Sequence, residues 1–340
     1  MHIVIVTDAW APQVNGVVRT LQAVRDELEK TGHRISLISP DQFASLPCPT
    51  YPEIRLALTT RRRVGAMIDA LWPDAVHIAT EGPLGVAARR WCLRTGRPFT
   101  TAYHTQFPDY VAKRTRLPAD WFWRYIAWFH RPASAVLVST PTIAATLRER
   151  GIGRLRPWGR GVDLDNFTPD APPLPEYESL KRPIHLYVGR VAVEKNIEAF
   201  LELDLPGSKL VVGGGPALAE LRQRYRSAHF LGPRHGIELA SAYAGADVLV
   251  FPSRTDTFGL VIVEALACGT PVAAFPVAGP IDLLTDEVGA VDEDLARAAG
   301  AALTRDRTAC ARYGRSFTWQ ASARQFLDAL APIPDQAGAA

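Results

Sequence analysis

Residues 248–264 read VLVFPSRTDTFGLVIVE, which combines a short apolar run, a polar turn and the start of a helical pattern. The run Val248–Phe251 has no polar position, so it predicts a strand that is buried on both faces. Asp256 lies in the turn, and Gly259 comes directly before the helical pattern. Strand, turn and helix in this order are typical of an α/β fold whose functional groups collect at the carboxyl ends of parallel strands.

The same alternation runs through all 340 residues, and helical patterns such as Val17–Thr31 and Leu84–Thr95 separate several of the apolar runs. The predicted strands are His2–Val6, Arg34–Ile38, Ala75–Ile78, Phe99–Tyr103, Ala135–Ser139, Ile184–Val188, Lys209–Val212, His229–Leu231, Val248–Phe251 and Pro271–Ala274. A chain of this length exceeds one ordinary core. We therefore expect two Rossmann-like domains, each a doubly wound parallel sheet.

Prolines crowd the stretch Thr168–Lys181, which cannot hold a helix or a central strand. We therefore expect a first domain over residues 1–168 and a second over residues 169–315, with this stretch as their linker and hinge. The last helical pattern, over about residues 316–335, has no strand after it and is expected to pack back on the first domain. Ligands in doubly wound folds bind at the carboxyl ends of the strands, which we expect to face a cleft between the domains.

Charge is unevenly distributed along the chain. Residues 1–170 contain 22 Lys and Arg against 15 Asp and Glu, whereas the remainder contains 16 against 20, which together give the net +3. A basic first half indicates an anionic partner, either a membrane surface, a nucleic acid or a substrate. The small net charge and the lack of a nucleic-acid-binding motif argue against nucleic acid.

The cysteines and the N-terminus indicate the cellular compartment. The four cysteines lie far apart and form no CxxC pair, which argues against a zinc knuckle or a disulfide framework and fits a reducing cytoplasm. The N-terminus lacks the pattern of a signal peptide, and no stretch reaches the roughly 20 apolar residues that span a bilayer. We therefore expect a cytoplasmic protein, at most peripheral at the inner face of the cell membrane.

Three glycine-containing or basic loops follow predicted strands. Gly16 opens a helix, where backbone N–H groups favour an anion. Arg190 and Lys195 follow the strand 184–188 and could neutralise a diphosphate without a metal. Gly215 ends a glycine turn that would allow close approach to a phosphate or ribose. Because the dinucleotide pattern GxGxxG is missing, a hydride-transfer cofactor is disfavoured.

Two carboxylates flank the start of the helix that follows Val248–Phe251. Asp256 could accept hydrogen bonds from sugar hydroxyls and Glu264 from both ribose hydroxyls. The segment Phe258–Leu260 leaves N–H donors at the helix start, which form a further anion site. The alternative interpretation is that Asp256 is a simple N-cap and Glu264 a surface helix residue.

With its continuation ALACGTPV, this segment resembles the signature of glycosyltransferase family 4, which has the GT-B fold. That signature is two acidic residues separated by seven, with Phe-Gly between them. The stretches GRVAVEKN at 189–196, GGGP at 213–216 and RGVD at 160–163 and the loop at Gly16 follow in the family's order. The resemblance covers nearly the whole chain. It implies a retaining transferase that takes a hexose or hexuronic acid from a nucleotide sugar.

The resemblance also implies roles for individual residues. Arg190 and Lys195 would bind the diphosphate, Glu264 the ribose, and Asp256 with the backbone amides of Phe258, Gly259 and Leu260 the donor sugar. Gly16 and Gly215 would border the donor, and His104 would lie near the sugar and the acceptor. No metal is expected at the site.

One position departs from the family's pattern. The first acidic residue is usually Glu, whereas this chain has the shorter Asp256. A covalent glycosyl-enzyme would need a carboxylate beneath the anomeric carbon, and Asp256 is the only obvious candidate. We expect front-face transfer instead, in which the departing phosphate oxygen helps to deprotonate the acceptor.

The acceptor is expected to be a membrane lipid of diacylglycerol or ceramide type. This hypothesis rests on basic and aromatic residues in the first half, which suit an anionic membrane surface. They are Arg61, Arg62, Arg63, Trp121, Trp123 and Trp128, with Lys113, Arg114 and Arg116 nearby. The alternative is that most of these aromatic side chains are core residues.

Other interpretations remain open at this point. Synthesis of polysaccharides or soluble glycosides, a nucleotide-sugar epimerase and a non-catalytic binding protein would each use a similar donor site. UDP-glucose, UDP-glucuronate and GDP-mannose are all candidate donors. The sequence predicts no oligomeric state.

Overall fold

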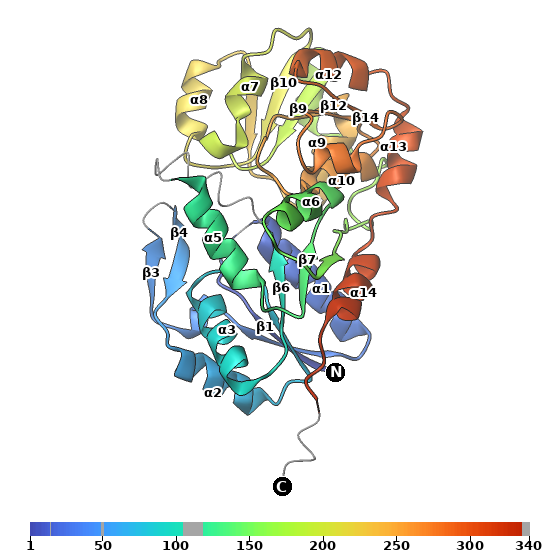
Figure 1. Cartoon of the computed structure of the whole chain (residues 1–340). Coiled ribbons are helices and arrows are strands. Elements are labelled where there is room, and N and C mark those ends of the chain that lie inside the picture. Colours follow the sequence, from blue (N-terminus) through green and yellow to red (C-terminus); the bar gives the residue numbers. More distant parts are fainter. Residues whose placement is uncertain (14, 49–50, 105–117, 335–340) are drawn as a thin grey trace. The chain divides into compact units, whose positions relative to one another are not determined.

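The computed structural model describes residues 1–13, 15–48, 51–104 and 118–334. The chain divides into two compact units, one made of Met1–Gly159 with Trp319–Ala340 and the other of Arg160–Thr318. Each unit is built on a six-stranded parallel sheet. The predicted α/β class with two doubly wound domains is therefore confirmed, and each unit is described by itself below (Figure 1).

Unit 1 has the strand order β2-β1-β5-β6-β7-β8, and all five strand pairs are parallel. Its strands are β1 His2–Val6, β2 Arg34–Ile38, β5 Ala75–Ile78, β6 Thr100–Tyr103, β7 Ala135–Val138 and β8 Leu155–Pro157, with an antiparallel hairpin of β3 Ser45–Cys48 and β4 Tyr51–Ala57. Its helices are α1 Gly16–Lys30, η1 Pro40–Gln42, α2 Arg61–Leu71, α3 Pro83–Thr95, α5 Ala119–His130, α6 Pro141–Glu149 and α14 Trp319–Ala329.

The last helix belongs to unit 1. Helix α14 packs beside α1, and Phe326 is fully buried in the core cluster that contains Ile3 and Leu21 (Figure 1). At the end of unit 1's first segment, Gly159 donates its N–H to Gln325 Oε1 at 2.7 Å and accepts from Ser322 Oγ at 2.8 Å. Two segments far apart in sequence therefore close one core.

Unit 2 has the strand order β11-β10-β9-β12-β13-β14, again all parallel. Its strands are β9 Ile184–Val188, β10 Ser208–Val212, β11 His229–Gly232, β12 Val248–Phe251, β13 Val272–Ala274 and β14 Gly289–Val291. Its helices are η2 Pro175–Ser179, η3 Val193–Lys195, α7 Ile197–Leu201, α8 Leu218–Arg224, α9 Gly236–Gly245, α10 Leu260–Ala267, α11 Pro280–Leu283, α12 Leu295–Ala302 and α13 Arg307–Gly314.

The proline-rich stretch is part of unit 2 and does not link the units. Phe167, Leu174 and Tyr177 are buried in the core of unit 2, and the Tyr177 hydroxyl donates to the carbonyl of Ala242. The chain enters unit 2 at Gly159/Arg160 and leaves it at Thr318/Trp319, whereas the sequence predicted entry at 168/169 and a return to the first domain near residue 316. The prolines correctly predicted an irregular backbone for this stretch. Its buried aromatic side chains, however, place the stretch in the core of unit 2.

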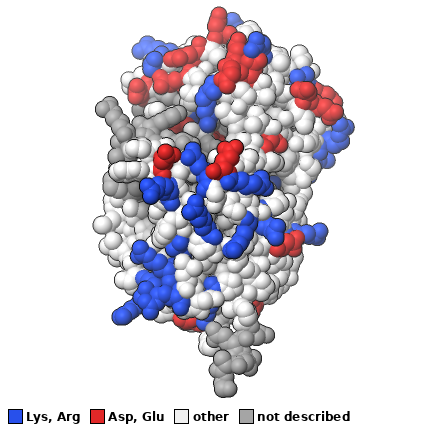
Figure 2. Space-filling model, in the orientation of Figure 1, with Lys and Arg blue, Asp and Glu red and all other residues white. Residues whose placement is uncertain are grey.

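Basic side chains gather on one face of unit 1. Figure 2 shows Lys and Arg concentrated over the region that α2, α3 and α5 occupy in Figure 1. Part of the positive charge of the first half of the sequence therefore lies on this face.

Candidate functional site

The carboxyl ends of β10, β9 and β12 lie side by side at one edge of the unit 2 sheet. The turns after β9 and β10 are in close contact, because Val191 donates its N–H to Gly214 O at 2.9 Å. A Cβ atom on Gly215 would lie 2.3 Å from the carbonyl oxygen of Val191, so no side chain fits there. The packing of these two turns thus accounts for the glycine.

This edge brings the predicted charged residues together. Lys195 Nζ lies 2.5 Å from Asp256 Oδ1, which joins the turn after β9 to the turn after β12. Asn196 Nδ2 donates to the carbonyl of Pro252 at 3.0 Å and ties the same two turns. Arg190 follows β9 on the same edge, with its Nε 3.9 Å from Glu194 Oε1. Arg190, Lys195 and Asp256 therefore share one edge of the sheet.

The Lys195 ammonium controls the charge on Asp256. Burial by itself would raise the pKa of the Asp256 carboxyl, but the charge and hydrogen bond of Lys195 outweigh it and lower the pKa below its usual value. The second oxygen, Oδ2, is buried and has no hydrogen-bond partner among the residues that the structure describes. Asp256 is thus an ionised acceptor that is held by Lys195 at Oδ1, and the Ser253 side chain also contributes to its lowered pKa.

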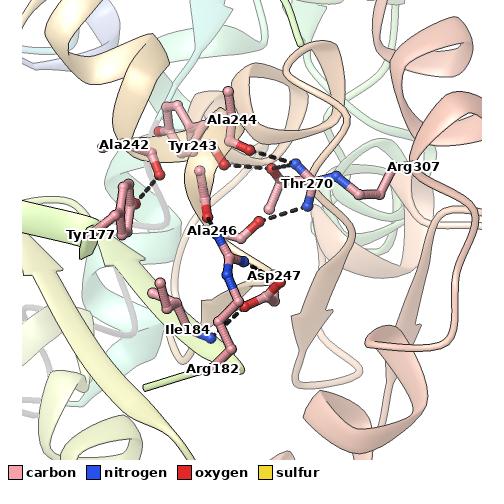
Figure 3. A network of polar contacts seen from close by, with 11 residues as sticks. Tyr177, Arg182, Ile184, Ala242, Tyr243, Ala244, Ala246, Asp247, Thr270 and Arg307 are labelled. Carbon is pink, nitrogen blue, oxygen red and sulfur yellow. Dashed lines mark hydrogen bonds and ion pairs between the residues drawn. The ribbon is translucent and has the colours of Figure 1, made fainter. Parts of the chain in front are cut away.

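Glu264 is an interior residue, so the alternative of a surface helix position is wrong. It lies in α10, is only 1% exposed, and accepts a hydrogen bond from the Tyr243 hydroxyl at 2.9 Å. Figure 3 shows how the main chain around Tyr243 is held: Thr270 Oγ1 donates to Tyr243 O at 2.6 Å, and Arg307 donates to Ala244 O and Ala246 O at 2.6 Å each. A buried carboxylate is costly unless it is hydrogen-bonded, and Tyr243 supplies such a bond.

The start of α10 contains the other predicted donor-binding residues. Phe258 is buried and its ring packs edge-on against Phe317, with centroids 6.4 Å apart. Gly259 is the N-cap residue, and no side chain caps this helix start. The amides of Phe258, Gly259 and Leu260 as ligands of the donor stay a prediction.

The remaining predicted residues lie in unit 1. Gly16 begins α1, but Asn15 Oδ1 already accepts the N–H groups of Val17 and Val18 at 3.0 Å. His104 directly follows β6, and its ring stands edge-on to the buried Trp158, with centroids 5.3 Å apart. Trp158 thus packs against the ring of this histidine.

The aromatic helix α5 is only partly a surface. Trp121 is 62% exposed and Trp128 40% exposed, whereas Trp123 is 4% exposed and stacks on Tyr103. The prediction of Trp123 as a residue exposed to the membrane is therefore wrong, because its side chain is almost fully buried and only borders the surface beneath Arg150, whose guanidinium lies 4.9 Å from the ring centre. Lys113, Arg114 and Arg116 lie outside the described residues.

An arginine-rich hollow lies along α5. Its volume is about 910 Å³, and its lining residues are Arg89, Asp120, Trp123, Arg124, Ala127, Trp128, Arg131, Pro132 and Arg150. Four arginines against one aspartate make it positive. Arg61 and Arg62 line a second hollow of about 350 Å³, whereas Arg63 stacks on Phe43 with its guanidinium 4.5 Å from the ring centre.

Three further polar residues of unit 1 were not predicted from the sequence. Asp8 and Glu81 follow β1 and β5, and His130 ends α5 with its Nε2 3.1 Å from Glu81 Oε1. Asp8 and Glu81 come shortly after predicted strands, which was the available signal. His130 carries no such signal, because only the fold brings it to Glu81.

Two negative findings complete the description. Among the helices that the structure describes, none combines the length and apolarity needed to cross a membrane. Within the described ranges, His, Cys, Asp and Glu form no group of three or more that could hold a metal ion.

Replacing Lys195 by Met tests the ion pair with Asp256. The variant should lose about 1–4 kcal/mol of unfolding free energy at pH 7, between the values for exposed and buried pairs. In the native protein the pair stabilises above the usual carboxyl pKa, and this contribution is lost as pH falls through the lowered pKa. The deficit of the variant should therefore grow from pH 3 to pH 7 in urea titrations. Lys181→Met, at an exposed site of unit 2, is the control; a deficit that does not change with pH would contradict this account.

Known proteins resemble the chain along its length. Residues 14–166 match the family described as Glycosyltransferase Family 4, and residues 182–305 match the family Glycosyl transferases group 1. A GDP-mannose-dependent alpha-mannosyltransferase of Mycobacterium tuberculosis (strain CDC 1551 / Oshkosh) is 32% identical over 313 residues, which cover 84% of this chain and 82% of the relative. An alpha-monoglucosyldiacylglycerol synthase of Streptococcus pneumoniae (strain ATCC BAA-255 / R6) is 27% identical, over 81% of this chain and 71% of the relative.

Solved structures agree on the fold. Sucrose-phosphate synthase from Thermosynechococcus elongatus superposes with a TM-score of 0.75 at 22% identity, over 96% of this chain and 97% of that one. Anabaena HepE in complex with UDP-glucose gives a TM-score of 0.71 at 15% identity, over 96% and 98%. Together with the family matches, these findings show that the chain is a hexosyltransferase of GT-B fold and belongs to glycosyltransferase family 4.

Proposed function

We propose that this glycosyltransferase transfers a hexose, with retention, from a nucleotide sugar bound by unit 2 to a membrane lipid bound by unit 1. The Lys195–Asp256 pair at the carboxyl edge of the unit 2 sheet carries this proposal. Arg190 and Lys195 would bind the diphosphate and stabilise the charge that develops as the glycosidic bond breaks. Glu264, oriented by Tyr243, would hold the ribose.

Asp256 is suited to bind the sugar and poorly suited to attack it. A carboxylate whose pKa is lowered by an ammonium 2.5 Å away is a weaker nucleophile than an unpaired one. The Asp256 side chain is 23% exposed, so its carboxylate can accept a hydrogen bond from a donor-sugar hydroxyl. We therefore propose front-face transfer, in which the leaving phosphate oxygen takes the acceptor proton and His104 lies near the sugar.

Replacing Asp256 by Asn separates the two mechanisms. Loss of a charged hydrogen bond to the sugar should lower kcat about 10- to 100-fold. Mass spectrometry of the native protein incubated with donor alone should detect no covalent sugar. A glycosylated Asp256 peptide in that experiment would establish a covalent intermediate and contradict front-face transfer. Asp170→Asn, at an exposed position of unit 2, is the matched control.

The proposed donor is GDP-mannose, because three of the similar proteins are GDP-mannose-dependent alpha-mannosyltransferases. The protein should transfer radiolabelled mannose to a lipid extract faster than it transfers glucose or glucuronate from the UDP-sugars. We also propose that no metal takes part, so EDTA should leave the rate unchanged. Label that enters only water-soluble glycosides or polysaccharide would refute the lipid acceptor and leave the transferase intact.

The lipid acceptor is supported by the surface of unit 1. The names of similar proteins include a monoglucosyldiacylglycerol synthase, and exposed Trp121 and Trp128 lie on the helix that borders the arginine-rich hollow. Arginine beside tryptophan suits the boundary of an anionic bilayer. The basic residues Arg61 and Arg62 line the second hollow of the same unit.

Exchanging two exposed arginines of this hollow tests binding to the membrane. Arg124→Gln with Arg131→Gln should lower the partition coefficient onto phosphatidylglycerol vesicles about 30-fold, since each basic residue near the surface contributes about 1 kcal/mol. Sedimentation with phosphatidylcholine vesicles should be low for both proteins. The control pair is Arg222→Gln with Arg226→Gln on the surface of unit 2. Equal sedimentation of the native protein with both kinds of vesicle would remove the membrane surface from the proposal.

A further inference from the structure

The carboxyl ends of β1 and β5 form the topological switch point of unit 1. These strands are neighbours, but the chain continues from β1 to β2 on one side and from β5 to β6 on the other. Ligands of doubly wound folds bind in the crevice that this reversal leaves outside the sheet. Asp8 follows β1 and Glu81 follows β5, so two carboxylates stand at this point.

Asp8 uses its carboxylate to fix the loop that carries Glu81. Its Oδ1 accepts the N–H of Leu84 at 2.9 Å, and its Oδ2 accepts the Thr80 hydroxyl at 2.9 Å and the N–H of Gly85 at 3.3 Å. A Cβ on Gly82 would lie 2.4 Å from Asp8 Cγ, so the loop lies directly against this side chain. Asp8 is 6% exposed and is therefore a structural residue of the site.

Glu81 is held in place but remains accessible. Its side chain is 25% exposed, and its Oε1 lies 3.1 Å from Nε2 of His130, which is fully buried. A carboxylate only accepts, so Nε2 carries the proton, while Nδ1 lies 2.8 Å from Thr101 Oγ1. The main chain is fixed as well, because the Tyr125 hydroxyl donates to the Glu81 carbonyl.

This asymmetry points to a ligand. The His130 side chain is fully buried, whereas the Glu81 side chain is 25% exposed, so this contact fixes the carboxylate and leaves part of it open to a ligand. Among the residues that the structure describes, His130 makes the one hydrogen bond to this carboxylate, which offers about four lone-pair sites and so keeps acceptor capacity. Fixed orientation with accessible oxygens is what a binding group for hydroxyls requires.

We propose that Glu81 binds the acceptor, with His130 as its positioning residue. This inference rests on the proposed function in one respect, that unit 1 holds the acceptor. The Glu81 carboxylate accepts a hydrogen bond from a hydroxyl of the acceptor headgroup. Asp8 beside it adds a second carboxyl group, so a phosphate at this position is repelled. The acceptor class is therefore a neutral polyhydroxy headgroup, such as a glycosyl or glyceryl group.

Replacing Glu81 by Gln tests the assignment, because the amide keeps the shape and removes the charge. With a neutral alkyl glucoside and a glucosyl-diacylglycerol as acceptors, kcat/KM for the acceptor should fall about 10- to 100-fold. The KM for the donor and its slow hydrolysis without acceptor should change less than about twofold. Glu149→Gln, at an exposed site on α6 of the same unit, should behave like the native protein.

A second variant addresses the histidine. His130→Gln retains an N–H donor near Oε1, so it should raise the acceptor KM less than Glu81→Gln and leave the donor KM unchanged. If His130→Gln lowers the melting temperature, the Glu81→Gln result still decides, because Glu81 is not a core residue. An equal loss in donor and acceptor parameters for Glu81→Gln would show a structural role and overturn the proposal.

Comparing the acceptors shows whether a negative result concerns the role of Glu81 or the proposed lipid acceptor. If the native protein uses only the soluble glucoside, the lipid acceptor is wrong, yet the ratio of Glu81→Gln to native activity still tests Glu81. If the native protein prefers a phosphate-bearing acceptor such as phosphatidylinositol, the neutral headgroup is refuted. Unchanged acceptor kinetics in Glu81→Gln would refute the residue assignment while leaving the lipid acceptor in place.

Discussion

The contact between Lys195 and Asp256 organises the candidate donor site. The two residues come from loops that follow neighbouring strands, and their 2.5 Å contact joins those loops. The ammonium is the main group that keeps the carboxylate ionised in spite of burial, and the same contact holds Asp256 in position. A ligand that enters this site meets a charge pair that is already formed, and it must match the geometry of that pair.

Hydrogen bonds in the interior of unit 2 hold Glu264 and the main chain around Tyr243 in place. Tyr243 makes two buried hydrogen bonds: its hydroxyl donates to the Glu264 carboxylate, and its main-chain carbonyl accepts from the Thr270 hydroxyl. Arg307 belongs to α13 and yet donates to the main chain at the end of α9. A carboxylate with almost no exposed surface is thus oriented by residues that come from distant parts of the sequence.

Elements that are specified by neighbouring residues could be predicted from the sequence, whereas contacts between residues far apart in the sequence could not. Apolar runs predicted β1, β5, β9 and β12 with their observed bounds, because a buried strand is specified by its own residues. The edge strand β2 was also predicted with its observed bounds, although only its last residue is buried. The three-residue edge strands β8 and β14 carry too little apolar sequence to stand out. Lys195 and Asp256 were predicted from loop position, whereas the Glu81–His130 contact depends on packing that no local pattern encodes. Trp123 illustrates the same limit, since helical position alone did not reveal which face of α5 is buried.

The order in which the ribosome makes this chain differs from the order in which its cores can close. Because the chain enters unit 2 at Arg160 and returns at Trp319, unit 2 is an insertion within the sequence of unit 1. All residues of unit 2 emerge before α14, whose Phe326 packs against the fully buried Trp158. The inserted unit can therefore complete its core during synthesis, whereas the enclosing unit keeps part of its apolar interior uncovered until the final helix is released.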